Sequence, residues 1–303
     1  MERTNAYSLL DFLDNSPCNF FAIATIQRYL DDNGFQELKQ SERWNLEKGG
    51  KYYVKKNDTA IFGFVIGETP LDQSGFNMIS AHSDSPCFRI KPNPEMLADG
   101  VLKLNTEVYG GPILYTWFDR PLSLAGRVIV RNPQNPARPI TKLIDFASPV
   151  LIIPHLAIHF NRNVNAGNPL SKQKDMLPIA AIVSDSMSKN NFLIDQIKER
   201  LEIADSKDIL DFDLMLYNCQ KSQLVGFNKE FICSGRIDDL SMAHAALSAL
   251  LNSDNPATTK VMAIFDNEET GSGTKQGAAS PVLASILHRV STCMGLDDEG
   301  FYQ

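Results

Sequence analysis

The chain has 303 residues, a formal net charge of −7, 43% apolar residues and 21% charged residues. This length is enough for about two domains with a sizeable core. The composition excludes a disordered or collagen-like chain. Acidic residues outnumber basic ones and no basic block occurs, which argues against a nucleic-acid-binding protein. Acidic substrates are not excluded, because the total charge does not set the charge of one pocket.

Cysteine usage and hydropathy bear on the compartment. The five cysteines are widely spaced and form no CxxC pair, so a disulfide framework or a cysteine zinc site is not expected. The N-terminal segment carries acidic residues inside its first apolar stretch, unlike a signal peptide. The most apolar run, 147–160, is interrupted by prolines and histidines and is shorter than the ~20 residues that cross a bilayer. We therefore expect a soluble, cytoplasmic protein.

The first third of the chain predicts helices followed by strands. Apolar residues at helical spacing predict helices over 7–13 and 20–29, separated by a break at 15–17. Runs rich in β-branched and aromatic residues then predict strands. These strands are 52–54, 60–65 and 76–81.

The middle of the chain differs from both ends. Between Gly100 and about Pro154, short alternating segments broken by glycine and proline predict antiparallel strands, and polar residues predict a long loop over 163–173. The last part predicts strands and helices at 213–217, 231–233, 239–251, 261–265 and 281–290. Strand and helix units at both ends, flanking an all-β middle, indicate an α/β domain interrupted by a β-rich insertion.

His82 stands at the carboxyl end of a predicted strand, where open α/β sheets place ligands. Asp84 follows two residues later. This spacing lets the histidine bind a metal while the aspartate orients the imidazole. Taken alone, such a triplet is more often a polar turn.

Two acidic pairs also follow predicted strands. Glu268 and Glu269 come directly after the strand 261–265, and adjacent carboxylates repel, so both are either needed or exposed. In a metal hydrolase one can bind an ion while the other takes a proton from water. The alternative is a solvated acidic turn. Asp238 could bridge two metals and Asp239 could cap the helix that follows, or both could simply cap it.

Three such clusters at strand ends are more informative together than singly. Carboxylate oxygens with one imidazole per ion suit zinc or a similar divalent metal in a two-metal hydrolytic site. The glycines of 271–277 look like a dinucleotide loop, but the third glycine comes one residue late. A loop that lets the backbone pack closely beside the acidic pair fits better. His244 and His288 are expected to be packing or surface residues rather than ligands.

With these clusters in order, the sequence resembles the aspartyl aminopeptidases of the M18 metallopeptidase family. The resemblance extends over essentially the whole chain. The segments that carry it are GFQEL with ERWNL, AHSDSPCFRIKP, EVYGGPILYTWFDRPLSLAGRVIV, IPHLAIHFNRNVN, EFICSGRIDDL and FDNEETGSGTKQGAAS.

The resemblance implies an aminopeptidase that removes N-terminal Asp or Glu from peptides at a site with two zinc ions, with cobalt or manganese as alternative ions. By motif, His82 resembles a ligand of one metal and Asp84 its orienting residue. Asp238 resembles the bridging ligand, Glu268 the general base and Glu269 a ligand of the other metal. The implied mechanism is activation of water by Glu268, attack on the first peptide carbonyl and stabilisation of the oxyanion by zinc.

The family also implies an architecture and an assembly. The fold expected is α/β, with a zinc exopeptidase-like three-layer α/β/α catalytic domain formed by 1–92 and 228–303 and a β-rich dimerisation domain inserted at 93–227. His159 resembles a histidine that family members need for activity, and which is thought to reach the active site of a neighbouring subunit. His155 is the less favoured of the two. Expected partners are acidic peptides and further copies of the chain, in dimers that build a dodecamer, but neither nucleic acid nor membrane.

The sequence departs from the family pattern near its end. Family members continue past Gln303 with an aspartate in a segment like SADMAHA and a late histidine, which complete the two metal positions. The stretches that shape the substrate pocket are missing with them, and Asp239 stands where many relatives have Asn. A second hypothesis is therefore a catalytically incomplete form that acts only as an assembly or binding protein. Nucleotide binding at 271–277 is a weak third.

Overall fold

The computed structural model describes residues 2–183, 190–254 and 256–303, which form two compact units. The first unit contains the described residues up to Ser85 together with those from Ser222 onward, and the second contains those from Pro86 to Lys221. Both boundaries between the units lie a few residues before the expected domain boundaries, which were 92/93 and 227/228. The reason is strand pairing: β5 (Cys87–Ala98) pairs with a strand of the second unit from its first residue, whereas β11 (Gln223–Val225) pairs within the first unit.

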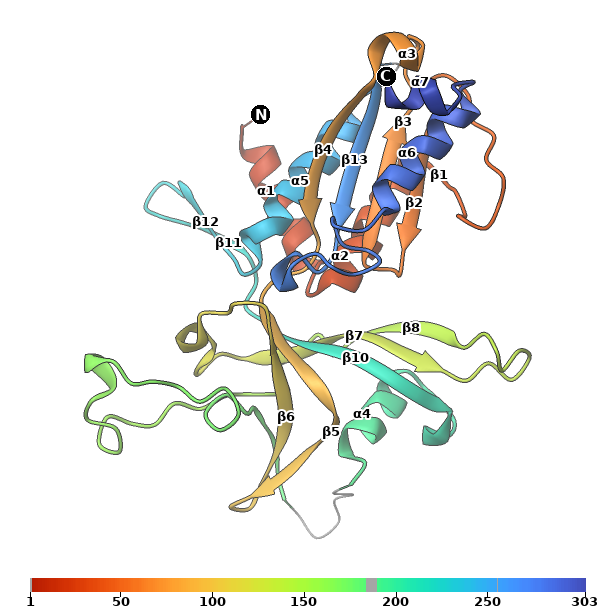
Figure 1. The fold of residues 1–303 in the computed structure, drawn as a ribbon. Coiled ribbons are helices and arrows are strands. Elements are labelled where there is room, and N and C mark those ends of the chain that lie inside the picture. Colours follow the sequence, from red (N-terminus) through yellow and green to blue (C-terminus); the bar gives the residue numbers. More distant parts are fainter. Residues whose placement is uncertain (1, 184–189, 255) are drawn as a thin grey trace. The chain divides into compact units, whose positions relative to one another are not determined.

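The first unit is built on a mixed sheet with the strand order β1-β2-β3-β13-β4 (Figure 1). Strand β13 runs antiparallel to β3 and parallel to β4, with Phe265 opposite His82. The carboxyl ends of β4 and β13 therefore lie side by side, although they are far apart in the sequence. The strands are β1 (Gln36–Glu37), β2 (Lys51–Lys56), β3 (Ala60–Val65), β4 (Phe76–His82) and β13 (Thr259–Phe265).

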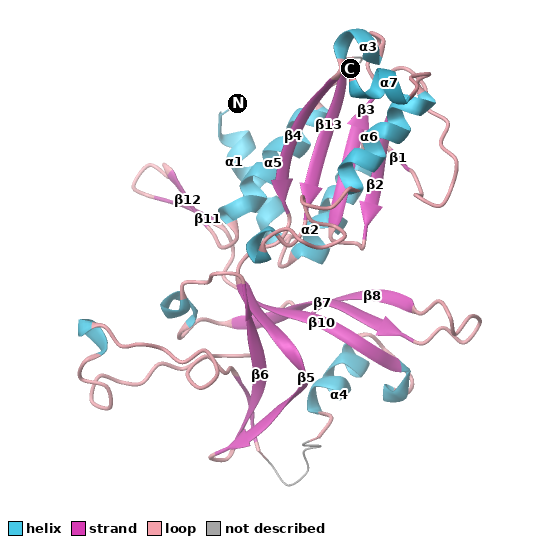
Figure 2. Ribbon diagram, viewed as in Figure 1, coloured by secondary structure: helices cyan, strands magenta, loops and turns pink. Residues whose placement is uncertain are grey.

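Helices cover both faces of this sheet, as Figure 2 shows. On one face, three helices bury apolar side chains together with Tyr53, Ile61 and Ile264 of the sheet. On the other face, α6 buries Val282 and Ile286 with the alternate side chains of the same strands, as expected from the two-residue period of a strand. The helices are α1 (Glu2–Asp14), α2 (Asn19–Asp32), α3 (Leu71–Ser74), α5 (Ile237–Leu251), α6 (Val282–Cys293) and α7 (Asp298–Tyr302).

The predicted helices and strands of this unit are confirmed, with small changes at their ends. The break at 15–17 separates α1 from α2, and Pro281 directly precedes α6. A hairpin of β11 and β12 (Phe231–Cys233) leads into α5. Among the described residues, no helix combines the length and the apolar character that crossing a bilayer requires.

The second unit is an antiparallel sheet with the strand order β8-β7-β10-β5-β6-β9. Helix α4 packs Leu193 and Ile197 into the apolar cluster of this sheet. The antiparallel strands expected after Gly100 are therefore present. The further elements are β6 (Val101–Tyr109), β7 (Leu122–Val130), β8 (Ile140–Asp145), β9 (Ile179–Ile182), α4 (Phe192–Arg200) and β10 (Ile209–Asn218), with 3₁₀ helices at Leu114–Trp117, Val164–Ala166 and Ser206–Asp208.

Candidate functional site

The side chains singled out by the sequence in the first unit come together where β4 and β13 end. His82 is the last residue of β4, and Asp84 follows in the loop. Glu268 and Glu269 begin a short 3₁₀ helix (Glu268–Thr270) just after β13, and Asp238 lies in the first turn of α5. Parallel pairing of β4 with β13 brings the first two groups to one edge of the sheet.

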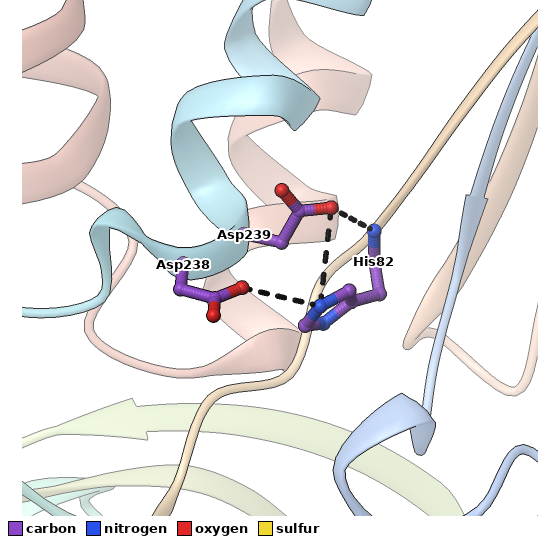
Figure 3. A group of neighbouring side chains, drawn as sticks. All are labelled: His82, Asp238 and Asp239. Atoms are coloured by element: carbon purple, nitrogen blue, oxygen red, sulfur yellow. Dashed lines mark hydrogen bonds and ion pairs between the residues drawn. The ribbon is translucent and has the colours of Figure 1, made fainter.

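The imidazole of His82 lies at the centre of this group. Its Nε2 is 3.5 Å from Oδ1 of Asp238, 3.9 Å from Oδ2 of Asp239 and 3.8 Å from Oε2 of Glu268. Figure 3 shows the two aspartates beside the ring. His82 belongs to two groups of potential metal ligands, one with Asp238 and Asp239 and one with Glu268 and Glu269. Within each group the potential ligand atoms lie within 4.8 Å of one another.

Asp84 holds both the histidine and the glutamates. Its buried Oδ1 lies 3.2 Å from Nδ1 of His82. The same carboxylate accepts two backbone hydrogen bonds, each at 3.2 Å. The amide of Glu268 donates to Oδ1, and the amide of Glu269 donates to Oδ2. The sequence predicted the first of these contacts. The second depends on the β4–β13 register, which no local pattern reveals.

Asp239 contacts the histidine rather than the helix start. Asp238 and Asp239 have non-helical backbone angles although they lie within the bounds of α5. Oδ2 of Asp239 accepts a hydrogen bond from the backbone amide of His82 at 3.1 Å. Two adjacent aspartates at a helix start are a common capping pattern, and so the sequence favoured a cap. The second aspartate is the informative signal, because one side chain is enough to cap a helix.

The carboxylates change the protonation of the histidine. Burial disfavours the imidazolium, but the hydrogen bond to Asp84 and the charges of Asp84, Asp239 and Glu268 outweigh it and raise the pKa of His82 to about 9. Burial raises the pKa values of Asp239 and Glu269, and His82 opposes both shifts. The site therefore holds more negative charge than its one imidazole can balance.

The glycine-rich segment after the glutamates closes into a tight loop. A Cβ atom at Gly277 would overlap the carbonyl oxygen of Ser272, and Gly271 has φ +93°. Both positions require glycine, because a side chain would clash in the first and be strained in the second. The glycines thus serve close backbone packing beside the acidic pair, as the sequence indicated.

The other histidines lie outside this cluster. His159 is exposed, in a turn of the second unit, and His155 in the same unit contacts the rings of Tyr115 and Phe118. His244 on α5 is hydrogen-bonded to Ser8, and His288 on α6 is hydrogen-bonded to Asp298. The last two are packing and surface residues, as expected.

The donor set fits a zinc-like divalent ion. Histidine ligands of metals usually have the ring nitrogen that is not bound to the metal fixed by a carboxylate or carbonyl, as Asp84 fixes Nδ1 of His82. Two ligands about 2.1 Å from a tetrahedral ion are roughly 3.4 Å apart. The separation of 3.5 Å between Nε2 of His82 and Oδ1 of Asp238 is close to that spacing. A shared ion would also balance the excess of carboxylates.

Comparison with known proteins points to one family. A family model described as "Aminopeptidase I zinc metalloprotease (M18)" matches residues 12–300. A curated relative from Clostridium novyi, "Probable M18 family aminopeptidase 2", is 50% identical over 98% of this chain and 69% of its own length.

Solved structures share the mixed α/β fold. The similar protein in a structure of the Ape4 and Nbr1 complex has a TM-score of 0.91 at 33% identity, covering 98% of this chain and 61% of that one. A Saccharomyces cerevisiae mApe1 dodecamer has a TM-score of 0.81 at 24% identity, covering 95% of this chain and 66% of that one. The chain thus spans between 61% and 69% of the length of these relatives.

Proposed function

The chain belongs to the M18 family of zinc metalloproteases, and we propose that it acts as a metallo-aminopeptidase, removing N-terminal Asp or Glu from peptides. One observation carries the proposal: the imidazole of His82, fixed by Asp84, is surrounded by carboxylates from two distant parts of the chain. The preference for acidic residues rests on the resemblance to aspartyl aminopeptidases.

The proposed ligands are His82 for one zinc ion, Asp238 for both ions and Glu269 for the second. When bound, zinc supplies a Lewis acid that polarises the peptide carbonyl and stabilises the developing oxyanion. Cobalt or manganese ions are alternatives with similar ligand preferences. Asp84 contributes by holding the proton of His82 at Nδ1, which leaves the lone pair of Nε2 for the ion.

Glu268 is the proposed general base. Its side chain is 57% exposed, and its Oε2 lies 3.8 Å from Nε2 of His82. The backbone amide of Glu268 is hydrogen-bonded to Asp84, so the residue is fixed through its main chain while its carboxylate stays accessible. Such a carboxylate can take a proton from the attacking water and deliver it to the leaving amine.

The two units have separate proposed roles. The first is a catalytic domain with helices on both faces of its sheet, and the second is a dimerisation domain. His159 is exposed in the second unit, as a side chain must be if it is to reach the active site of another subunit. Dimers that build a dodecamer are part of the proposal, and S. cerevisiae mApe1 forms a dodecamer. A cytoplasmic location rests on the cysteine usage of the sequence.

Chromogenic amides of Asp, Glu and Leu, assayed with added zinc, cobalt or manganese, test this function. The Asp and Glu amides should be cleaved in preference to the Leu amide, and Glu268→Gln should lose that cleavage. Absence of hydrolysis both by this chain and by a form extended to the length of its relatives would contradict the proposal. A stable oligomer without bound metal would instead favour the second hypothesis, an assembly or binding protein.

A further inference from the structure

Two segments, here called the Asp238 arm (236–239) and the glutamate arm (266–270), share an unusual backbone feature. Each contains a left-handed residue that is not glycine, just before its acidic residues. These are Arg236, with φ 59° and ψ 25°, and Asn267, with φ 61° and ψ 28°. Side chains disfavour this conformation, so the surrounding structure must hold it in place.

The Asp238 arm is fastened to the junction of α1 and α2. The guanidinium of Arg236 donates from Nε to the carbonyl oxygen of Ser16 at 2.9 Å and from Nη2 to that of Leu13 at 3.1 Å. Leu13 lies in the last turn of α1 and Ser16 in the break that follows it, so Arg236 donates to two carbonyls at this junction while fixing its own position. A two-point contact of this kind restrains both the position and the orientation of the guanidinium.

The glutamate arm is fastened to the same junction through a buried carboxylate. Nδ2 of Asn19 donates to Oδ1 of Asp266 at 3.0 Å, and this oxygen also accepts the amide of Asn267 at 2.8 Å. Nε2 of Gln276 lies 3.3 Å from Oδ2 of Asp266 and 3.0 Å from Oδ1 of Asn267. Asp266 is 2% exposed, so these donors offset the cost of burying its charge. They also fix the residue that precedes Glu268.

We propose that the junction of α1 and α2, residues 13–19, is a common positioning element for both arms of the metal site. The positioning residues are Arg236, which fastens the Asp238 arm to the junction, and Asn19, which fastens the junction to the glutamate arm. Together they set the distance between Asp238 and the glutamates. That the arms bind metal rests on the proposed function. The positioning itself is a property of the metal-free chain and can be tested without metal.

Amide hydrogen exchange in the metal-free protein reports on the two arms separately. The amide of His82 donates to Asp239 and reports on the Asp238 arm. The amides of Glu268 and Glu269 donate to Asp84 and report on the glutamate arm. Exchange of these amides requires the corresponding arm to open locally.

Each positioning residue should affect its own arm. Arg236→Lys keeps the charge but loses the two-point contact, and it should speed exchange at His82 by about tenfold or more. Asn19→Ala should speed exchange at Glu268 and Glu269 by a similar factor. Each variant should leave the other arm nearly unchanged.

The chain offers a matched control for each variant. Arg289→Lys removes a guanidinium that also donates to two backbone carbonyls, those of Gln40 and Glu42. Asn33→Ala removes a side-chain amide at the other end of α2, where it donates to the carbonyl of Tyr29. Neither control should change exchange in the two arms.

A cobalt(II) titration followed by visible absorption provides a second readout. Arg236→Lys and Asn19→Ala should each weaken cobalt affinity by about 10- to 100-fold, and the controls should not. The proposal would be overturned if the amides of the two arms exchanged no faster in Arg236→Lys and Asn19→Ala than in the control variants. It would also be overturned if the buried amides of β3 were accelerated equally, because that result indicates global destabilisation. If neither this chain nor a form extended to the length of its relatives binds cobalt but the arm-specific exchange is seen, the proposed function fails and the positioning role stands.

Discussion

Asp213 of the second unit and the carboxylates around His82 in the first unit differ in how their charge is balanced. In the second unit, Arg89 and Asp213 face each other from adjacent strands, with Nη2 and Oδ1 2.6 Å apart, so a fixed cation neutralises the carboxylate. In the first unit, several carboxylates surround the one imidazole of His82. Both potential metal-binding groups found among the described residues belong to the first unit. A surplus of carboxylates around one imidazole, rather than the presence of carboxylates alone, is the charge that a bound cation would balance.

The sharpest test of this comparison is removal of the imidazole. His82→Ala should abolish binding of the zinc or cobalt ion that His82 is proposed to hold, and it removes the one residue common to both groups of potential ligands. Isothermal titration with either ion measures the effect. His244→Ala is the matched control, since that side chain packs against α1 and should leave binding intact. Full binding by His82→Ala would refute the assignment.

The pH dependence of metal binding tests the charge surplus itself. The pKa of His82 is raised from 6.5 to about 9, so at neutral pH the metal-free imidazole is protonated. A metal ion must displace that proton, and the apparent affinity should therefore rise with pH and level off only above about pH 9. Between pH 7 and pH 9 the gain should be about 50-fold, measured by competition titration with a chelator. An affinity that is independent of pH in this range would contradict the raised pKa.

Asp84→Asn should weaken zinc affinity by about 10- to 100-fold. Asparagine keeps one acceptor oxygen, which cannot serve His82 and the glutamate amides as the carboxylate does. Asp213→Asn in the second unit is the control, and it should leave zinc affinity unchanged because the ion pairs it weakens, with Arg89 and Arg127, both lie within that unit. If both variants bind zinc equally well, Asp84 does not support the metal site.

The smallest effect on metal binding is expected from the second unit. His159→Ala should leave zinc affinity unchanged, because His159 belongs to the other compact unit and not to the cluster around His82. Under the proposed function, the same variant should lose peptidase activity in the assembled enzyme. Titration and activity assays on one preparation separate the two effects. A weakened zinc affinity would show that the site is not confined to the first unit.

Local patterns predicted most of the secondary structure but not every strand. β13 and α5 follow apolar patterns that are readable in the sequence. Strand β5 was missed, since its prolines argue against a strand, and it accommodates them with a register shift between Ile90 and Glu95. Such an irregularity depends on the neighbouring strand, which the local sequence does not specify.

The candidate site was predictable to a similar extent. Residues at strand ends could be grouped, because the carboxyl ends of parallel strands meet at one edge of a sheet. Two sets of hydrogen bonds could not be predicted. These are the bonds from the backbone amides of Glu268 and Glu269 to Asp84, and the bond from the backbone amide of His82 to Asp239. Both join residues more than 150 positions apart in the sequence, and they exist only once the sheet register is set.

The proposed metal site is tested most directly by diffraction from crystals of the zinc-loaded chain, measured at the zinc absorption edge. An anomalous peak is expected about 2.0–2.2 Å from Nε2 of His82 and from a carboxylate oxygen of Asp238. A second peak near Glu269 would support the proposed second zinc ion. Absence of any peak at His82 in zinc-loaded crystals, or a peak only elsewhere in the molecule, would contradict the central claim that these residues form a metal site.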